Sequence, residues 1–182
     1  MTYPSELETL FTAKDGQKLF FRPEKPVDTE MLWVMFSTLS EESVSNLIPP
    51  FTRERIEGWT SNINHKEVLA VVAVTQGPVP AEIVAAASLK FNMQEVFKHK
   101  AELGITVHDN YQNLGVGTAL LNHLLTIAKK MELKKIFLNV NVTNARAFHV
   151  YKKAGFEVEG TLRKELLLKK EFLDEYRMAL FL

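Results

Sequence analysis

The pattern of apolar and polar positions along the chain predicts short strands that alternate with amphipathic helices. Apolar residues recur at helical spacing from Val116 to Met131, so this segment is the best-defined helix. Two β-branched and alanine-rich runs, Val68 to Thr75 and Ile83 to Phe91, flank Gln76-Gly77-Pro78 and predict an antiparallel hairpin. The periodicity therefore indicates a mixed α/β chain.

The remaining elements follow from the same two periods and from the turn residues between them. Further strands are expected at Gln17 to Arg22, Glu102 to Val107, Ile136 to Val142, Phe156 to Leu168 and Glu175 to Leu182. Further helices are expected at residues 28–39, 52–59 and 144–153. The resulting order is β-α-α-β-β-β-α-β-α-β-β, which predicts about seven strands and four helices.

Length and composition fit one ordinary globular domain. The chain has 182 residues, of which 46% are apolar and 24% are charged. It contains no internal repeat, low-complexity tract or flexible linker. We therefore expect a single domain over residues 1–182, with a core over roughly residues 15–182.

Charge and cysteine content narrow the function classes. Lys plus Arg and Asp plus Glu both number 22, so no overall basic field attracts nucleic acid or an anionic membrane. The absence of cysteine excludes disulfides, thiolate catalysis and cysteine zinc sites, and the five histidines lack metal-ligand spacing. The segment Met1 to Glu6 has no secretory signal, and no run of about 18 apolar residues occurs. A cytoplasmic protein without a metal is expected, as a monomer or a homodimer.

The most informative segment for chemistry is the turn that leads into the helix at Val116. Gly115 and Gly117 let the backbone approach a ligand, and the first helical turn presents unpaired N–H groups at the positive end of the helix dipole. Such a site suits a diphosphate. A P-loop does not fit because Thr118 stands in place of its lysine, and a dinucleotide fingerprint does not fit because Leu120 replaces its third glycine.

The turn Gln112 to Gly117 resembles the motif Gln/Arg-x-x-Gly-x-Gly/Ala, the cofactor motif of the GNAT superfamily of N-acetyltransferases. The segment Asn144 to Phe156 is similar to that family's second pattern, Asn-x-x-Ala-x-x-x-Tyr-x-x-x-Gly-Phe. For the first motif, the alternative is a glycine-rich helix start without a ligand. For the second motif, the alternative is that Asn144 only caps the helix while Tyr151 packs in the core. Two motifs in the family's order favour the enzyme.

The resemblance implies the GNAT fold, a mixed and mostly antiparallel central sheet flanked by helices, and acetyl-CoA as co-substrate. It also implies which residues contact acetyl-CoA. They come from the end of the strand before the turn, from the turn itself and from the second motif, and they are Thr106, Val107, Gln112, Asn113, Leu114, Gly115, Val116, Gly117, Thr118, Asn144 and Tyr151.

The reaction implied by the resemblance is direct attack of a primary amine on the acetyl thioester, which needs a base for the amine proton. The resemblance makes Glu102 the expected base, because its place ten residues before Gln112 is similar to that of the glutamate in relatives that acetylate protein lysines. Strand alternation puts Glu102 on one face with Gly104 and Thr106. The alternative for Glu102 is a solvated strand residue. Tyr151 is the expected proton donor to the leaving thiolate, and a backbone N–H near Val107 is the expected oxyanion donor.

The acceptor is open between a protein lysine, which is slightly favoured, and a polyamine or other small amine. Lys14 to Pro23 and Leu39 to Val44 look like protein-lysine acetyltransferase domains, whereas Gly160 to Arg163 and Asp174 to Met178 are similar to ribosomal-protein and polyamine N-acetyltransferases. Asn139 stands where some relatives carry a glutamate, which counts against N-terminal acetylation of a ribosomal protein. A regulatory module that binds acyl-CoA without turnover is the alternative from another class, and the use of other acyl-CoAs is open.

Overall fold

The computed structural model describes residues 8–77 and 80–182. Two segments discussed above therefore lie outside the described residues, namely Met1 to Glu6 and Pro78 of the predicted hairpin turn. An eight-stranded sheet forms the centre, in the order β1-β2-β3-β4-β5-β6-β8-β7. Its strands are β1 (Thr9–Thr12), β2 (Lys18–Pro23), β3 (Val68–Thr75), β4 (Ile83–Phe91), β5 (Lys100–Val107), β6 (Lys135–Asn141), β7 (Glu157–Leu168) and β8 (Glu171–Phe181). The α-helices are α1 (Thr29–Ser37), α2 (Glu41–Ser45), α3 (Arg53–Ser61), α4 (Val116–Lys130) and α5 (Ala145–Lys153).

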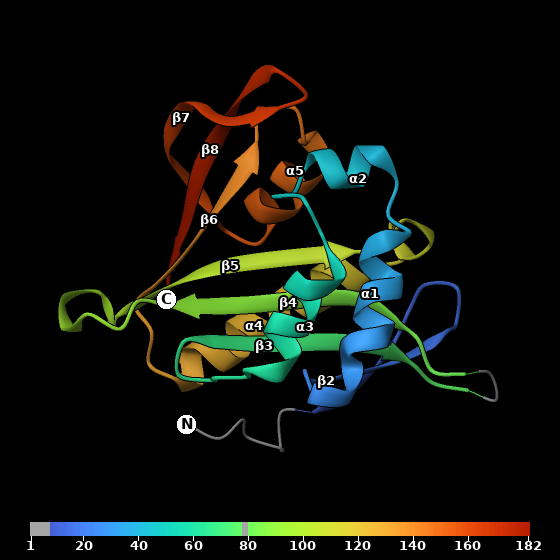
Figure 1. The fold of residues 1–182 in the computed structure, drawn as a ribbon. Coiled ribbons are helices and arrows are strands. Elements are labelled where there is room, and N and C mark those ends of the chain that lie inside the picture. The colour runs from blue at the N-terminus through green and yellow to red at the C-terminus, as the bar shows by residue number, and fades with distance from the viewer. Residues whose placement is uncertain (1–7, 78–79) are drawn as a thin grey trace.

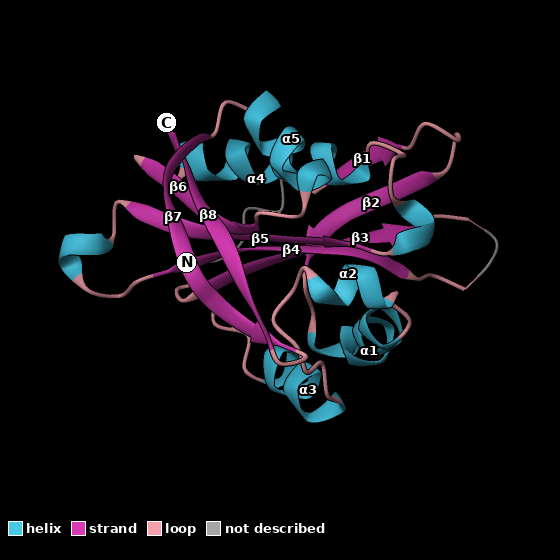
Figure 2. Cartoon of the chain, turned by 90° about the horizontal axis from the view of Figure 1, so that it is seen from above, coloured by secondary structure: helices cyan, strands magenta, loops and turns pink. Residues whose placement is uncertain are grey.

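The helices cover the sheet from both sides. Helices α4 and α5 lie on one face, and α1, α2 and α3 lie on the other (Figure 2). Leu120 and Leu124 of α4 are fully buried against a core that includes Leu103 and Leu138 of the sheet. Burial of each such leucine contributes about 2 kcal/mol relative to exposure. None of the helices within the described ranges is long and apolar enough to cross a membrane.

A second, smaller core joins the N-terminal helices to the opposite face of the sheet. Leu32 of α1 and Ile56 of α3 are fully buried there, together with Val72 of β3 and Ile83 of β4. Thr52 caps α3 as its sequence predicts, because its side-chain oxygen accepts a hydrogen bond from the backbone N–H of Arg55. This core fixes α1 and α3 in front of the sheet (Figure 1).

The sheet divides between β5 and β6. These strands form the single parallel pair among the described strands, and their pairing ends at Glu102 opposite Phe137. β5 continues alongside β4 as far as Val107, whereas β6 continues alongside β8 as far as Asn141. Figure 1 shows the consequence, since β6, β7 and β8 turn away from β5 and leave the two strands splayed.

The splay leaves backbone groups of β5 facing an opening. The N–H of His108 donates to the carbonyl of Val84 on β4, at 2.9 Å. Because alternate residues of an antiparallel strand direct their N–H and C=O groups to opposite sides, the backbone groups of Ile105 and Val107 face away from β4. They point toward the gap that β6 leaves, so backbone donors are available there.

The predicted element order is confirmed, with two additions that its pattern missed. β1 is a four-residue strand with Leu10 exposed, and α2 is a five-residue helix without a buried residue. Neither is long enough to establish a hydrophobic period. β8 also begins earlier than predicted, at Glu171, because the β7–β8 hairpin turns at Lys169 and Lys170, which both have positive φ. The described residues therefore form eight strands where seven were predicted, and five α-helices where four were predicted.

Candidate functional site

A cavity of about 880 Å³ opens where β5 and β6 separate. Its walls come from the splayed strands, from the turn before α4, from α5 and from the segment after α2. The structure brings together at this cavity most of the predicted site residues, namely Glu102, Thr106, Val107, Gln112, Asn113, Gly115, Gly117, Thr118, Asn144 and Tyr151. Its size lies in the range typical of small-molecule sites.

The glycine turn has the geometry of an anion site. Asn113 and Gly115 have positive φ values of 63° and 86°, which aim the chain into α4. The first bond of the helix runs from the N–H of Ala119 to the carbonyl of Gly115, at 3.0 Å. In the described part of the chain, no acceptor takes the N–H groups of residues 116–118. Three donors therefore stand free at the positive end of the α4 dipole.

Two of the predicted cofactor residues, Leu114 and Val116, do not line the cavity with the others. The side chain of Val116 is 1% exposed and belongs to the main core. The carbonyl of Leu114 accepts a hydrogen bond from the N–H of Lys14, at 3.1 Å, which ties the β1–β2 hairpin to the turn. A role of these two residues toward a ligand is therefore limited to their backbone groups, and their side chains hold the turn in place.

Gln112 points inward and braces the turn. Its Nε2 donates to the carbonyl of Val107 at 3.1 Å and to Oγ of Ser43 at 3.0 Å. Asp109 accepts from the N–H and Oγ of Ser40 at 2.8 and 2.7 Å and from Oγ of Ser43 at 2.7 Å. Partial burial alone would raise the pKa of Asp109, but the hydrogen bonds from Ser43 and Ser40 outweigh it and hold the pKa at about 2. The turn and α2 are thus linked by an ionised carboxylate.

The second motif lies on α5 beside the same cavity. Asn144 caps the helix, since its side-chain oxygen accepts from the N–H of Ala147 at 3.1 Å. Tyr151 packs against Phe156 with ring centroids 5.7 Å apart. Both of these structural roles were alternatives to a ligand role, yet both residues also line the cavity. Among the described residues none forms a hydrogen bond with the Tyr151 hydroxyl, and burial raises the pKa of Tyr151 to about 12.

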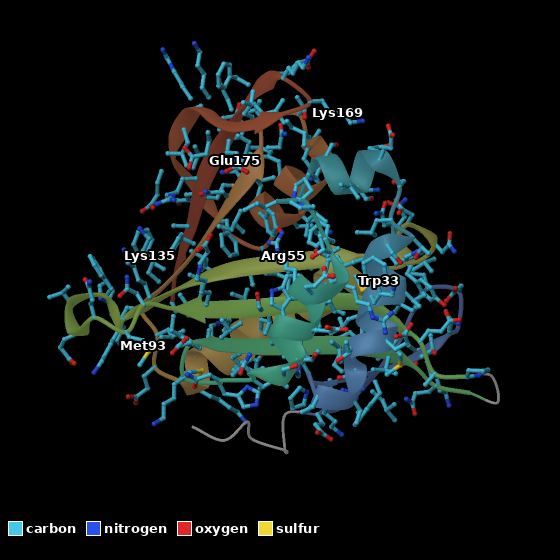
Figure 3. The ribbon with its side chains drawn as sticks, viewed as in Figure 1. Trp33, Arg55, Met93, Lys135, Lys169 and Glu175 are labelled. Carbon is cyan, nitrogen blue, oxygen red and sulfur yellow. The ribbon has the colours of Figure 1, made fainter. Side chains whose placement is uncertain are left out.

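One ionisable residue of the cavity, Glu175, was not predicted as a site residue. Glu175 of β8 lines the cavity with Glu102 and Asn139, and it is 9% exposed. Burial raises the pKa of the Glu175 carboxyl above its usual value. The signal in the sequence was weak, because a charged residue near a strand end resembles a solvated one until the neighbours of that strand are known. Figure 3 shows Glu175 on β8, within the part of the sheet that turns away from β5.

An ion pair joins the β7–β8 hairpin to α2. Nζ of Lys169, at the tip of the β7–β8 hairpin, lies 3.1 Å from a carboxylate oxygen of Glu41 on α2. Figure 3 shows Lys169 on the side of the hairpin that faces α2. Both side chains are largely exposed, so the pair contributes little to stability. It connects two elements whose neighbouring residues line the cavity.

Comparison with protein families gives a match over more than half of the chain. The sequence profile described as "Acetyltransferase (GNAT) family" matches residues 32–156. This range includes the glycine turn, Glu102 and Tyr151.

Curated relatives agree with this match over part of their length. The L-amino acid N-acetyltransferase AaaT of Escherichia coli (strain K12) is 34% identical over 102 residues, which are 56% of this chain and 63% of that protein. Spermidine N(1)-acetyltransferase of the same organism is 31% identical over 86 residues, which are 45% of each chain. The chain thus spans less than two thirds of the length of these relatives.

Solved structures share the fold. The GNAT domain of S. lividans PAT aligns with a TM-score of 0.78 at 20% identity, over 100% of both chains. The ribosomal-protein-S5-alanine acetyltransferase from Vibrio fischeri aligns with a TM-score of 0.82 at 17% identity, over 96% of both chains. At these identities the likeness concerns the fold.

Proposed function

This chain belongs to the acetyltransferase (GNAT) family, and on that premise we propose that it transfers the acetyl group of acetyl-CoA to a primary amine. One observation carries the proposal. Gly117 and Thr118, whose N–H groups have no acceptor among the described residues, line the same cavity as Glu102 and Tyr151. An anion site, a carboxylate and a phenol around one cavity are the groups that binding of a diphosphate and acyl transfer to an amine require.

We propose that acetyl-CoA lies between β5 and β6, with its diphosphate at the N–H groups of residues 116–118. The residues present fit that group, because three backbone donors lack acceptors and the glycines keep the approach free of side chains. Bound acetyl-CoA would supply an activated acyl thioester. The N–H of Val107 faces the splay and would donate to the thioester oxygen as negative charge develops there.

Glu102 and Tyr151 retain the roles that the sequence suggests, with one refinement. Glu102 is the proposed acceptor of the amine proton. The pKa of Tyr151 at about 12 keeps the phenol neutral at physiological pH, so it can donate a hydrogen bond to the leaving sulfur. A thiol has a pKa near 8.5, so complete proton transfer from Tyr151 is uphill by about 5 kcal/mol. We therefore assign Tyr151 to hydrogen bonding of the leaving sulfur, without transfer of its own proton.

For the acceptor, we place a protein lysine ahead of a polyamine or another small amine. The N-terminal sequence likeness to protein-lysine acetyltransferase domains supports the lysine, and the curated spermidine relative supports the polyamine. Glu102 and Glu175 both line the cavity, which favours any acceptor that arrives as a cation. The cytoplasmic location and the oligomeric state, monomer or homodimer, remain predictions.

Release of free thiol tests the proposal. The purified protein is mixed with acetyl-CoA and, in turn, lysine-rich proteins, polyamines, amino acids and peptides with free N-termini. The protein has no cysteine, so it adds no thiol background. Release with one acceptor class supports the enzyme and identifies that class. If no acceptor gives thiol release but acetyl-CoA stabilises the protein against heat, the result supports an acyl-CoA-binding module. If there is neither thiol release nor stabilisation, the result contradicts the cofactor assignment.

A further inference from the structure

Three polar side chains come together on one face of the sheet at the point where it divides. Leu103, Leu138 and Met178 belong to the core beneath α4. Because neighbouring strand residues point to opposite faces, Glu102, Asn139 and Arg177 point to the face that carries α1 and α3. The next residue on that face of β8 is Glu175, which pairs in register with Asn141 of β6.

The neighbours of Glu175 are held in fixed orientations. Nε of Arg177 donates to Oδ1 of Asn139 at 3.1 Å, and its guanidinium lies 5.2 Å from the centre of the Phe137 ring. The Asn139 oxygen is thus occupied, which leaves its NH₂ group to donate to the Glu175 carboxylate. None of the ion pairs among the described residues includes Glu175 or Glu102, so Arg177 is not paired with either carboxylate. Two carboxylates without a paired cation therefore border one cavity.

Charges on β5, β7 and β8 and a hydrogen bond from β6 act on the pKa of Glu175. Burial has the largest effect and raises the pKa of the carboxyl, and the charge of Glu165 on β7 raises it further. The hydrogen bond from Asn139 and the charge of Arg177 lower the pKa, while the charge of Glu102 on β5 raises it. Like charges at one site favour uptake of a proton or of a cation, since either relieves their repulsion.

Building on the proposed function, we propose that Glu175 is a second carboxylate of the acceptor site, which together with Glu102 binds the acceptor as an ammonium ion and takes its proton. In this step an N–H bond of the ammonium breaks, its electron pair stays on nitrogen, and an O–H bond forms on the carboxylate pair. The neutral amine then forms the C–N bond as the C–S bond breaks, and a second proton passes from nitrogen to the thiolate. The carboxyl returns its proton to water.

The pair explains why one carboxylate is buried. An exposed glutamate has a pKa near 4.3 and is a poor acceptor for the proton of an amine. A buried carboxylate next to a second negative charge holds a proton more strongly, while its partner stays ionised and keeps the cation in place. Glu175 supplies burial and Glu102 supplies the neighbouring charge.

The test compares pH profiles of kcat/KM for the wild type and three glutamine variants. Glu175→Gln removes the buried member of the proposed carboxylate pair and should lower kcat/KM by about 100-fold or more, with unchanged thermal stabilisation by acetyl-CoA. Glu165→Gln removes an exposed charge that raises the pKa of Glu175 and should move the acidic limb of the profile to lower pH without lowering its plateau. Glu171→Gln is the matched control, since it removes an exposed charge of the same hairpin and should leave the profile unchanged.

The outcomes separate this proposal from the proposed function. Thiol release by the wild type is measured first, and its absence with every acceptor counts against the acetyltransferase itself. With an active wild type, a Glu175→Gln variant that keeps the wild-type kcat/KM and acidic limb overturns the role of Glu175. If Glu175→Gln fails to fold, the Glu165→Gln profile decides, and an acidic limb that stays in place overturns the proposal.

Discussion

A buried cluster at the start of α1 makes stability depend on pH through Glu24. Arg22 forms a two-bonded ion pair with Asp28, at 2.6 and 2.7 Å, and Asp28 is fully buried. Glu24 lies beside this pair and is 8% exposed. Burial and the charge of Asp28 raise the pKa of Glu24 from 4.5 to about 7, although Arg22 lowers it.

The size and sign of the effect follow from the difference between the two pKa values. Between pH 4.5 and about 7 the unfolded chain ionises Glu24 while the folded chain keeps its proton, so folding loses stability as the pH rises. The loss amounts to about 3 kcal/mol, which corresponds to about 6–12 °C in Tm for a domain of this size. The contribution is fully present below pH 4.5 and is lost above about pH 7.

The change that isolates this contribution is Glu24→Gln, which keeps the shape and removes the titration. Thermal unfolding of both proteins from pH 5 to pH 8 should show the wild type losing Tm relative to Glu24→Gln. Other groups that titrate are present in both proteins, so their effects cancel in the difference. Glu82→Gln, at an exposed carboxylate, should follow the wild type. Parallel Tm curves for wild type and Glu24→Gln would refute the reasoning.

Three further predictions concern the site. Gly117→Val should abolish stabilisation by acetyl-CoA, because Gly117 lines the cavity beside Val107 and a valine side chain would occupy space that the diphosphate needs. Gly58→Ala on α3 has free space and should not affect the stabilisation, and equal stabilisation in both variants would contradict this prediction. Tyr151→Phe should lower kcat by about 10- to 100-fold, the value of a hydrogen bond to a charged group, and a kcat equal to that of wild type would remove the sulfur contact. Asp109→Asn should raise the KM for acetyl-CoA more than it changes kcat, since it loosens the link between the turn and α2, and steady-state kinetics check this. Wild type should lose stability as the pH falls below about 3.8 and Asp109 becomes protonated, whereas Asp109→Asn lacks this contribution, which acid unfolding of both proteins checks.

Local patterns predicted the elements that have a clear period and a clear boundary. Strands β3 and β4 match the predicted ranges because their apolar runs end at turn residues. The motif around Gln112 and the motif ending at Phe156 also lie within short stretches of chain, and the structure brings both to one cavity. Sequence therefore sufficed wherever neighbours in the chain determine the geometry.

Contacts between distant segments were beyond the reach of these patterns. Glu175 reaches the cavity because β8 inserts between β6 and β7, an arrangement that depends on the order of the sheet and not on local period. Gln112 lines the cavity, and the contact that holds its side chain there comes from Ser43, which lies 69 residues away in the chain. The short elements β1 and α2 escaped detection for a related reason, since pairing with β2 holds β1 and hydrogen bonds to Asp109 hold α2.

The most direct test of the central claim is a crystal structure of the protein with acetyl-CoA. The account predicts the diphosphate at the N–H groups of residues 116–118, the thioester in the gap between β5 and β6, and its oxygen at the N–H of Val107. A diphosphate bound elsewhere, or a thioester outside that gap, would contradict the assignment of the site.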